Sequence, residues 1–314
     1  MVLRGGSSSE REVSLSSGGR VATALLERGH DVSEADPSPD PLAIVDAARA
    51  ADVVWMALHG GAGEDGTIQA LFDLAGVTYT GSGHLGSALA MDKDLSKHLF
   101  RAAGVPTADW EMVTATTAES VWRDGAFAAR VMKALGSPIV VKPSKQGSTV
   151  GLSVVKAAAG LAPAIAEAFR HDDEVMLERY VPGRELTVGV LGGVALPVGE
   201  IIPKHEIYDY ECKYVAGMAE EIFPAKIPDA VAAEAQRFSL LACEALKVSG
   251  CVRVDYRLHP DGGLFCLEAN TLPGMTGTSL VPQAALAAGI TFPELCERIA
   301  LDAVRTRGGK GDRE

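Results

Sequence analysis

Oxygen-bearing side chains near the end of the chain could gather around a metal ion. Two segments, residues 251–258 and 264–270, alternate between apolar and polar residues as half-buried strands do. Their polar positions include an arginine, two carboxylates and an amide: Arg253, Asp255, Glu268 and Asn270. Carboxylate and amide oxygens are hard ligands that suit Mg²⁺. The pattern predicts a magnesium site, provided that these side chains share one face of a sheet.

The turn between the two segments decides whether they do. Residues 259–263 read His-Pro-Asp-Gly-Gly, in which Asp261-Gly262 is typical of a hairpin reversal. If those two residues form the loop, Asp255 lies directly opposite Glu268, and all four polar side chains point to one side. A slip of one residue would send Glu268 to the other face. The alternative interpretation is a solvated polar face.

A glycine-bearing, hydroxyl-rich loop at residues 145–149 could hold a phosphate through its backbone N–H groups. It is not a Walker A motif, because that motif leads into a helix, whereas this loop joins two strand-like segments. Lys142 and Lys97 could supply positive charge to phosphates. Taken alone, each of these lysines is typical of a solvated surface cation.

Two further positions are candidates. Glu10 precedes the first helix, where an acidic residue could equally be a partner for the helix dipole. His59 ends an apolar segment beside glycines, which favours a functional role over a structural one. Three tyrosines lie in one polar loop and could be surface contacts: Tyr208, Tyr210 and Tyr214. Serine or cysteine hydrolase chemistry has little support, since no arrangement of that type has accompanying motifs.

The elements that must position these residues alternate between strands and helices. Helices are expected at about 14–28, 67–75, 91–103, 160–170, 230–247 and 292–305. Strands are expected at 1–3, 31–32, 53–58, 138–144, 150–155, 175–181, 185–191 and 196–202, besides the hairpin. The first part predicts a small parallel sheet, whose ligands would lie at the carboxyl ends of its strands. The fold class is therefore α/β followed by α+β.

Composition excludes several classes of function. The chain has 314 residues and a formal net charge of −12, which argues against a nucleic acid or an acidic membrane as partner. No apolar run reaches the roughly 18 residues of a membrane span. The five cysteines show no metal-binding spacing. They predict reduced, mostly structural thiols in a cytoplasmic protein.

Read together, five blocks of sequence resemble the D-alanine–D-alanine ligases, which are ATP-grasp enzymes of bacterial cell-wall synthesis. They occur in the family's order and cover nearly the whole chain. The blocks are Ser9–Leu15, His59–Thr67, Tyr79–Gly83 leading to Met91-Asp92-Lys93, Tyr208–Tyr214, and Glu268–Thr276 with Ser279-Leu280. The resemblance implies an ATP-grasp fold in three units, 1–91, 92–180 and 181–314, in which the first is a pre-ATP-grasp domain and the other two grip ATP.

The implied reaction joins two D-alanines for peptidoglycan precursors in the cytoplasm. ATP phosphorylates the carboxylate of one D-alanine, and the amine of a second then displaces phosphate. The resemblance further implies Mg²⁺ or Mn²⁺, two ions in number, held by Asp255, Glu268 and Asn270. It also implies a homodimer. Catalysis of such a reaction rests on positioning and on neutralising charge.

The resemblance also assigns roles to individual residues. The implied ATP-binding residues are Lys97, Lys142, Gly147, Ser148, Thr149, Glu178, Arg179, Val181, Glu185 and Lys213. The implied catalytic residues are Glu10, Ser148, Tyr214, Arg253 and Gly274, and the implied D-alanine contacts are His59, Ser279 and Leu280. Among these, Glu10 fixes the first amino group and Arg253 stabilises the transferring phosphoryl group. Gly274 contributes a backbone N–H to the oxyanion hole.

Two alternatives remain open. A D-alanine–D-lactate or D-alanine–D-serine ligase would share these motifs, although Tyr214 favours an amine acceptor, since D-lactate ligases replace that tyrosine. A nucleotide-binding regulator that has lost catalysis is the alternative from another class. It is disfavoured because a regulator should have lost some of the charged residues that catalysis needs, whereas Glu10, Lys142 and Arg253 are all present.

Overall fold

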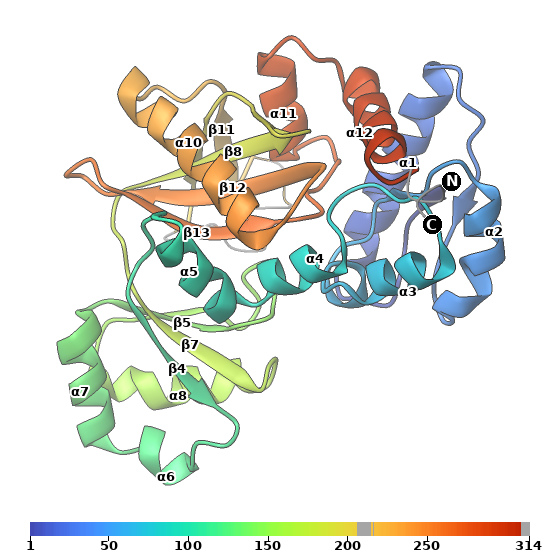
Figure 1. Ribbon diagram of the computed structural model, residues 1–314. Helices are drawn as coiled ribbons and strands as arrows, with labels where there is room; N and C mark the ends of the chain where they lie inside the picture. Colours follow the sequence, from blue (N-terminus) through green and yellow to red (C-terminus); the bar gives the residue numbers. More distant parts are fainter. Residues whose placement is uncertain (206–214, 216, 309–314) are drawn as a thin grey trace.

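The computed structural model describes residues 1–205, 215 and 217–308. Three sheets with helices packed around them make up this part of the chain (Figure 1). The predicted fold class, α/β with a small parallel sheet followed by α+β, is confirmed, and the two other sheets are antiparallel.

The first sheet is parallel, in the order β2-β1-β3. Its strands are β1 (Val2–Leu3), β2 (Glu34–Ala35) and β3 (Trp55–Met56). The helices around it are α1 (Arg11–Glu27), η1 (Pro41–Ile44), α2 (Val45–Ala50), η2 (Gly61–Gly63) and α3 (Thr67–Ala75). The strand expected at 31–32 was placed wrongly, because β1 pairs with Glu34 and Ala35 instead.

The second sheet is antiparallel, in the order β4-β7-β5-β6. Its strands are β4 (Trp110–Thr114), β5 (Ile139–Pro143), β6 (Ser153–Val155) and β7 (Glu174–Arg179). Its helices are α6 (Glu119–Trp122), α7 (Gly125–Leu135), η3 (Ala158–Gly160) and α8 (Leu161–Ala168). Apolar residues of α7 and α8, such as Val131 and Ile165, are fully buried with Leu177 of β7. This packing holds β5 and β7 in place. β5 leads into the glycine-bearing loop, and β7 leads into the segment that connects the second sheet with the third.

The third sheet is antiparallel, in the order β11-β10-β8-β12-β13, with β9 paired to β8. Its strands are β8 (Arg184–Leu191), β9 (Val194–Ala195), β10 (Gly199–Pro203), β11 (Ala219–Ile222), β12 (Cys251–Leu258) and β13 (Leu264–Asn270). The helices associated with it are α10 (Asp229–Leu246), α11 (Leu280–Ala287) and α12 (Phe292–Arg307). One core forms between this sheet and α10, and includes Val254 and Leu246.

Helices also tie the three sheets together. α4 (His84–Met91) and α5 (Lys93–Ala102) follow the first sheet, and α5 packs on α10 and β13, with Phe100 fully buried there. α12 packs beside α1, as Figure 1 shows near the N-terminus. The three sheets fall within the units 1–91, 92–180 and 181–314. α5 packs on α10 and β13 of the third unit, and its lysines also reach the second unit, where Lys97 contacts Glu178 and Lys93 contacts Gln146. No helix in the described ranges has the length and apolar character needed to cross a bilayer.

Candidate active site

The hairpin of β12 and β13 has the predicted pairing at its polar end. Asp255 lies opposite Glu268, and Arg253 lies opposite Asn270. Asp255 also accepts hydrogen bonds from Arg253, at 2.8 Å from Nη2 to Oδ2, and from Thr187 of β8, at 2.7 Å. The carboxylate is buried, so these donors orient it and offset the cost of its burial.

The turn differs from the expected two-residue loop. The backbone N–H of His259 donates to the carbonyl of Gly263, and Gly262 adopts a φ of +96°. Three residues therefore form the loop, which shifts the pairing beside it by one. A bulge between Asp255 and Tyr256 restores the register, with Leu267 as the extra residue. The prediction of the pairing was right, while its assumption about the turn was wrong.

The side chains at this end fit a hard divalent cation. Asp255, Glu268 and Asn270 offer only oxygen ligands, and Oδ1 of Asn270 accepts one hydrogen bond, from Leu272 at 3.0 Å, which leaves it a second lone pair. In the described ranges no group of three or more His, Cys, Asp or Glu side chains could by itself hold a metal ion. Two carboxylates with an amide suit Mg²⁺, which is usually held by one or two carboxylates together with substrate phosphates.

Lys93 connects the hairpin with the glycine-bearing loop. Its ammonium lies 3.4 Å from Oε2 of Glu268 and donates to the carbonyl of Gln146 at 2.8 Å. It stands at the first position of α5, directly after Asp92, whose carboxylate accepts from the backbone N–H of Leu95 and caps the helix. This nearly buried cation therefore lies between the acidic end of the hairpin and the glycine-bearing loop.

A second group of charges is buried around Glu178 of β7. Its carboxylate accepts from Lys97, which is fully buried, and from Lys142 at 2.7 Å. Burial raises the pKa of Glu178, but the two ammonium groups outweigh that effect and lower it to about 2. Burial also lowers the pKa of Lys97, against the opposing effect of Glu178.

The ammonium of Lys97 lies against Glu178 and Thr107, at 2.7 Å from Oγ1 of the latter, and Lys97 lines neither of the two cavities described below. Its contact with nucleotide phosphates stays a prediction. Lys93, one helical turn earlier, faces both cavities instead. Lys142 remains at the wall of the second cavity.

The glycine-bearing loop reaches across to the first helix. Ser148 donates to Oε1 of Glu10, which is itself buried. Ser148 and Thr149 have φ values of +50° and +65°, a left-handed conformation that non-glycine residues rarely adopt. The contact joins the second unit of the chain to the first at the tip of the loop.

His59 is held on two sides. Its carbonyl accepts from Ser8, and Nε2 of its ring lies 3.2 Å from Oγ of Ser17. Nδ1 lies 3.8 Å from Oε1 of Glu64. Since His59 is 6% exposed, these contacts fix the direction of its ring.

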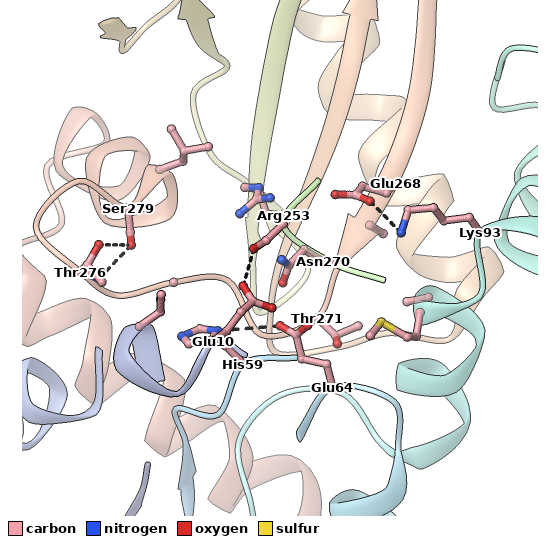
Figure 2. Close-up of a pocket in the computed structure, with 18 of the residues that line it drawn as sticks. Glu10, His59, Glu64, Lys93, Arg253, Glu268, Asn270, Thr271, Thr276 and Ser279 are labelled. Carbon is pink, nitrogen blue, oxygen red and sulfur yellow. Dashed lines mark hydrogen bonds and ion pairs between the residues drawn. The ribbon is translucent and has the colours of Figure 1, made fainter. Parts of the chain in front are cut away.

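Two cavities meet between these elements. The first cavity, of about 100 Å³, is bounded by all three units, and Figure 2 shows its labelled side chains converging from several elements. Its polar wall includes Glu10, His59, Glu64, Lys93, Ser148, Arg253, Glu268, Asn270 and Ser279. The second cavity, of about 140 Å³, lies between the second and third sheets and is more apolar. Four residues line both: Lys93, Gly147, Ser148 and Glu268.

The segment after β13 closes the first cavity. Gly274, Ser279 and Leu280 all line it. The Ser279 hydroxyl accepts from the backbone N–H of Thr276 at 2.8 Å and lies 2.9 Å from its hydroxyl. A Cβ at Gly274 would stand 2.7 Å from Oγ of Ser279, so glycine is needed for this close approach.

The chain between β7 and β8 forms one wall of the second cavity. Glu178, Arg179, Val181 and Glu185 line it, together with Thr149 and Lys142. Arg257 of β12 holds the chain between β7 and β8 in place, because its guanidinium donates to the carbonyls of Val181 at 3.0 Å and Gly183 at 2.8 Å. It also lies 3.3 Å from Glu185. Arg179 pairs with Asp109 at 2.9 Å. The candidates Lys213 and Tyr214 lie outside the described residues.

Sequence reasoning missed four residues of the site: Glu64, Lys93, Thr187 and Arg257. Lys93 follows Met91-Asp92 in a block that carried the resemblance, but the block gave it no role. Arg257 stands two positions after Asp255 and so shares its side of the strand. Thr187 could be found only from the pairing of β8 with β12, a long-range contact.

The four cysteines in the described ranges are buried and free, as expected for structural thiols. Burial raises the pKa values of Cys243, Cys251 and Cys296 to about 12. Thiols of this kind are poor nucleophiles near neutral pH.

The chain has a small parallel sheet followed by two antiparallel sheets with a cavity between them. This arrangement defines an ATP-grasp fold. A protein-family model described as the D-ala D-ala ligase C-terminus matches residues 99–300, and its N-terminal counterpart matches residues 38–82. The chain belongs to the D-alanine–D-alanine ligase family.

Relatives and solved structures cover almost the whole chain. A D-alanine–D-alanine ligase of Synechococcus sp. (strain JA-2-3B'a(2-13)) is 45% identical, covering 100% of this chain and 95% of its own. One from Anaeromyxobacter sp. (strain Fw109-5) is 48% identical, covering 95% and 94%. The crystal structure of the Bacillus anthracis ligase superposes with a TM-score of 0.85 at 32% identity, covering 99% and 98%. A second structure of that ligase is a complex with ATP.

Proposed function

We propose that this chain joins two D-alanine molecules into D-alanyl-D-alanine at the expense of ATP. The observation that carries the proposal is the convergence of Glu10 from the first unit with Arg253 and Glu268 from the third on one cavity. Relatives of nearly the same length carry the name D-alanine–D-alanine ligase. We further propose that the product serves peptidoglycan synthesis in the cytoplasm and that the chain works as a homodimer.

The reaction would proceed in two steps. The carboxylate of the first D-alanine attacks the γ-phosphorus of ATP, giving an acyl phosphate and ADP. The amine of the second D-alanine then attacks the acyl carbon, loses a proton and displaces inorganic phosphate. Each step gathers negative charge, so catalysis depends on positioning and on fixed positive groups.

The residues of the first cavity suit these needs. Glu10 offers a carboxylate to the amino group of the first D-alanine, and Ser148 holds that carboxylate in direction. Arg253 would stabilise the transferring phosphoryl group and the oxyanion, helped by the backbone N–H of Gly274. His59 lies where it could meet the first substrate's carboxylate, while Ser279 and Leu280 would form the pocket for the second D-alanine.

The second cavity suits the nucleotide. Lys142, Gly147 and Thr149 face the side where phosphates would lie, and Lys93 adds a cation that sequence reasoning did not assign. The backbone between Glu178 and Val181 would meet the adenine, and Glu185 the ribose, with Arg179 and Lys213 as further contacts. Asp255, Glu268 and Asn270 would hold two Mg²⁺ or Mn²⁺ ions, which when bound would screen the charge of the nucleotide phosphates.

A second candidate function differs from the proposed one only in the acceptor, which would be D-serine or D-lactate in place of the second D-alanine. The D-Ala:D-Ser ligase VanG of Enterococcus faecalis superposes with a TM-score of 0.82 at 28% identity, covering 96% of this chain, so the fold does not discriminate between acceptors. Tyr214 supports an amine acceptor. We expect Tyr214→Phe to raise the share of D-alanyl-D-lactate in mixed-acceptor assays, and an unchanged product ratio would remove this argument.

A coupled assay of ADP release tests the proposal. With ATP and Mg²⁺, D-alanine alone should support turnover. The rate of ADP release with D-alanine as acceptor should exceed the rate with D-lactate or D-serine as acceptor. Turnover that is faster with D-lactate or D-serine would reassign the acceptor. ATP binding without D-alanine-dependent phosphate release would support a regulator and contradict the proposal.

A further inference from the structure

Ser17 lies at a point where three segments of the first cavity meet. It is fully buried in α1, and its hydroxyl oxygen lies 3.2 Å from Nε2 of His59 and 3.1 Å from the backbone nitrogen of Met275. α1 follows Glu10, and Met275 directly follows Gly274. One hydroxyl therefore connects the helix after Glu10, the imidazole and the backbone next to Gly274.

The Ser17 hydroxyl accepts one of these hydrogen bonds and donates the other. The N–H of Met275 can only donate, so it uses a lone pair of the Ser17 oxygen. The hydroxyl hydrogen needs an acceptor of its own, because Ser17 is fully buried. Across the described part of the chain, Nε2 of His59 is the one acceptor within hydrogen-bond distance of it. Nε2 must then carry a lone pair, which places the proton of a neutral imidazole on Nδ1.

The proton on Nδ1 faces the first cavity. Nδ1 lies 3.8 Å from Oε1 of Glu64, and both His59 and Glu64 line the cavity (Figure 2). At that distance Glu64 attracts the N–H but does not form a short hydrogen bond with it. The ring thus keeps a donor available to an anionic group in the cavity.

We propose that Ser17 is a positioning residue that fixes His59 as the neutral tautomer protonated at Nδ1 and ties it to the segment of Gly274. The imidazole then presents its N–H to the carboxylate of the first D-alanine, and Ser17 sets the spacing between that donor and the backbone N–H of Gly274. This functional part rests on the proposed ligase activity, whereas the tautomer does not.

Ser14 provides a matched control on the same helix. It is also fully buried, three residues before Ser17, and its hydroxyl also makes two hydrogen bonds. Its partners, however, are backbone groups: it accepts from Gly5 at 2.8 Å and donates to Ala57 at 2.7 Å. Ser14→Ala therefore removes the same atoms from the same helix without touching His59.

The tautomer can be read directly by long-range ¹H–¹⁵N NMR of protein labelled at its seven histidines, with the His59 signals assigned from their loss in His59→Gln. We expect an Nδ1–H tautomer at neutral pH in the unaltered protein. We expect Ser17→Ala to move His59 toward the Nε2–H form and Ser14→Ala to leave the tautomer as it was. An Nε2–H or doubly protonated ring in the unaltered protein would overturn the proposal, with no variant needed.

Kinetics test the role in catalysis. Ser17→Ala should raise the KM for the first D-alanine about tenfold, as loss of an oriented donor would, and leave the KM for ATP within about twofold. Ser17→Cys, which keeps a weaker donor, should recover part of the loss and serves also if the alanine variant folds poorly. A KM for D-alanine that does not change in either variant would overturn the role. Absence of D-alanine-dependent turnover in the unaltered protein would instead contradict the proposed function and leave the NMR result standing.

Discussion

Asp255 and Glu268 face each other across β12 and β13 because two irregularities of the hairpin cancel. The loop at its end has one residue more than a two-residue turn, and the bulge at Leu267 takes up the difference. Without the bulge, the residue opposite Asp255 would be Leu267, and Glu268 would point to the other face. The bulge therefore matters to the proposed metal site as much as the carboxylates do.

Replacing Glu268 by Gln should abolish most turnover and leave the fold intact. The change removes a metal-binding charge from a side chain that is 30% exposed, and it removes no core volume. We expect kcat to fall by about 10²-fold or more, as for the loss of a major electrostatic contact at a reacting centre. ADP-release kinetics and thermal unfolding measure both properties.

Glu234→Gln is the control for that experiment. Glu234 lies on α10, exposed and 3.8 Å from Arg237, and it lines neither cavity. Its loss should leave kcat unchanged. Full activity of Glu268→Gln at saturating Mg²⁺ would rule out the assigned metal site.

Lys93 and Lys97 should respond to substitution in opposite ways. Lys93→Met removes a cation from the cavity wall, so the KM for ATP should rise about tenfold or more while unfolding changes little. Lys97→Met takes one of two cations from the buried carboxylate of Glu178 and should lower the free energy of unfolding by about 3 kcal/mol. Urea denaturation and initial rates separate the two effects. The reverse pattern would assign the phosphate contact to Lys97 and the structural role to Lys93.

These two lysines show which features of the candidate site could be predicted from the sequence and which could not. They stand one helical turn apart on α5, with the same residue type and a similar surrounding pattern. Helical periodicity places both on one side of the helix, but it does not say how deep each end of the helix is buried. That depth is set by β13 and α10, whose contacts with α5 are distant in sequence.

Local signals predicted helices and strands more successfully than they predicted long-range geometry. The helix at 67–75, the hairpin and the parallel sheet followed from periodicity and turn chemistry, and the structure confirms them. The segment of α4 was missed, since its small residues give a weak helical pattern. Thr187 was missed because only strand order brings it to Asp255.

Acid should destabilise the protein through Glu178. The pKa of its carboxyl is lowered from an ordinary value near 4.5 to about 2, because the charges of Lys142 and Lys97 outweigh burial. The depressed pKa means that the unfolded chain takes up this proton first as pH falls. The stabilising contribution is present above about pH 4.5 and is lost between about 4.5 and 2.

Chemical denaturation between pH 6 and pH 3 tests this expectation. The free energy of unfolding of the unaltered protein should fall across the lower part of that range, and Glu178→Gln should show a weaker dependence on pH, although it is less stable throughout. Equal slopes for the two proteins would show that folding does not lower the pKa of Glu178.

The anchoring of the glycine-bearing loop should control affinity for ATP from outside the cavity. Lys145 lies at the base of the loop, and its ammonium is 2.8 Å from Asp173, 3.2 Å from Glu174 and 3.5 Å from Asp172. These carboxylates hold the pKa of Lys145 above its usual value against the effect of burial. Its backbone N–H also donates to Asp172 at 2.6 Å. These contacts tie the base of the loop to residues 172–174.

Lys145→Met should loosen that base. A partly exposed network of ion pairs is worth about 1 kcal/mol, so the KM for ATP should rise about threefold to tenfold, with kcat changing less because Lys145 lines neither cavity. Lys145→Arg should keep the KM near its original value, and Lys133→Met, at an exposed position of α7, should have no effect. If Lys145→Arg impaired ATP binding as much as Lys145→Met, the ion pairs could not be the cause, and packing of the long side chain would have to explain the position of the loop.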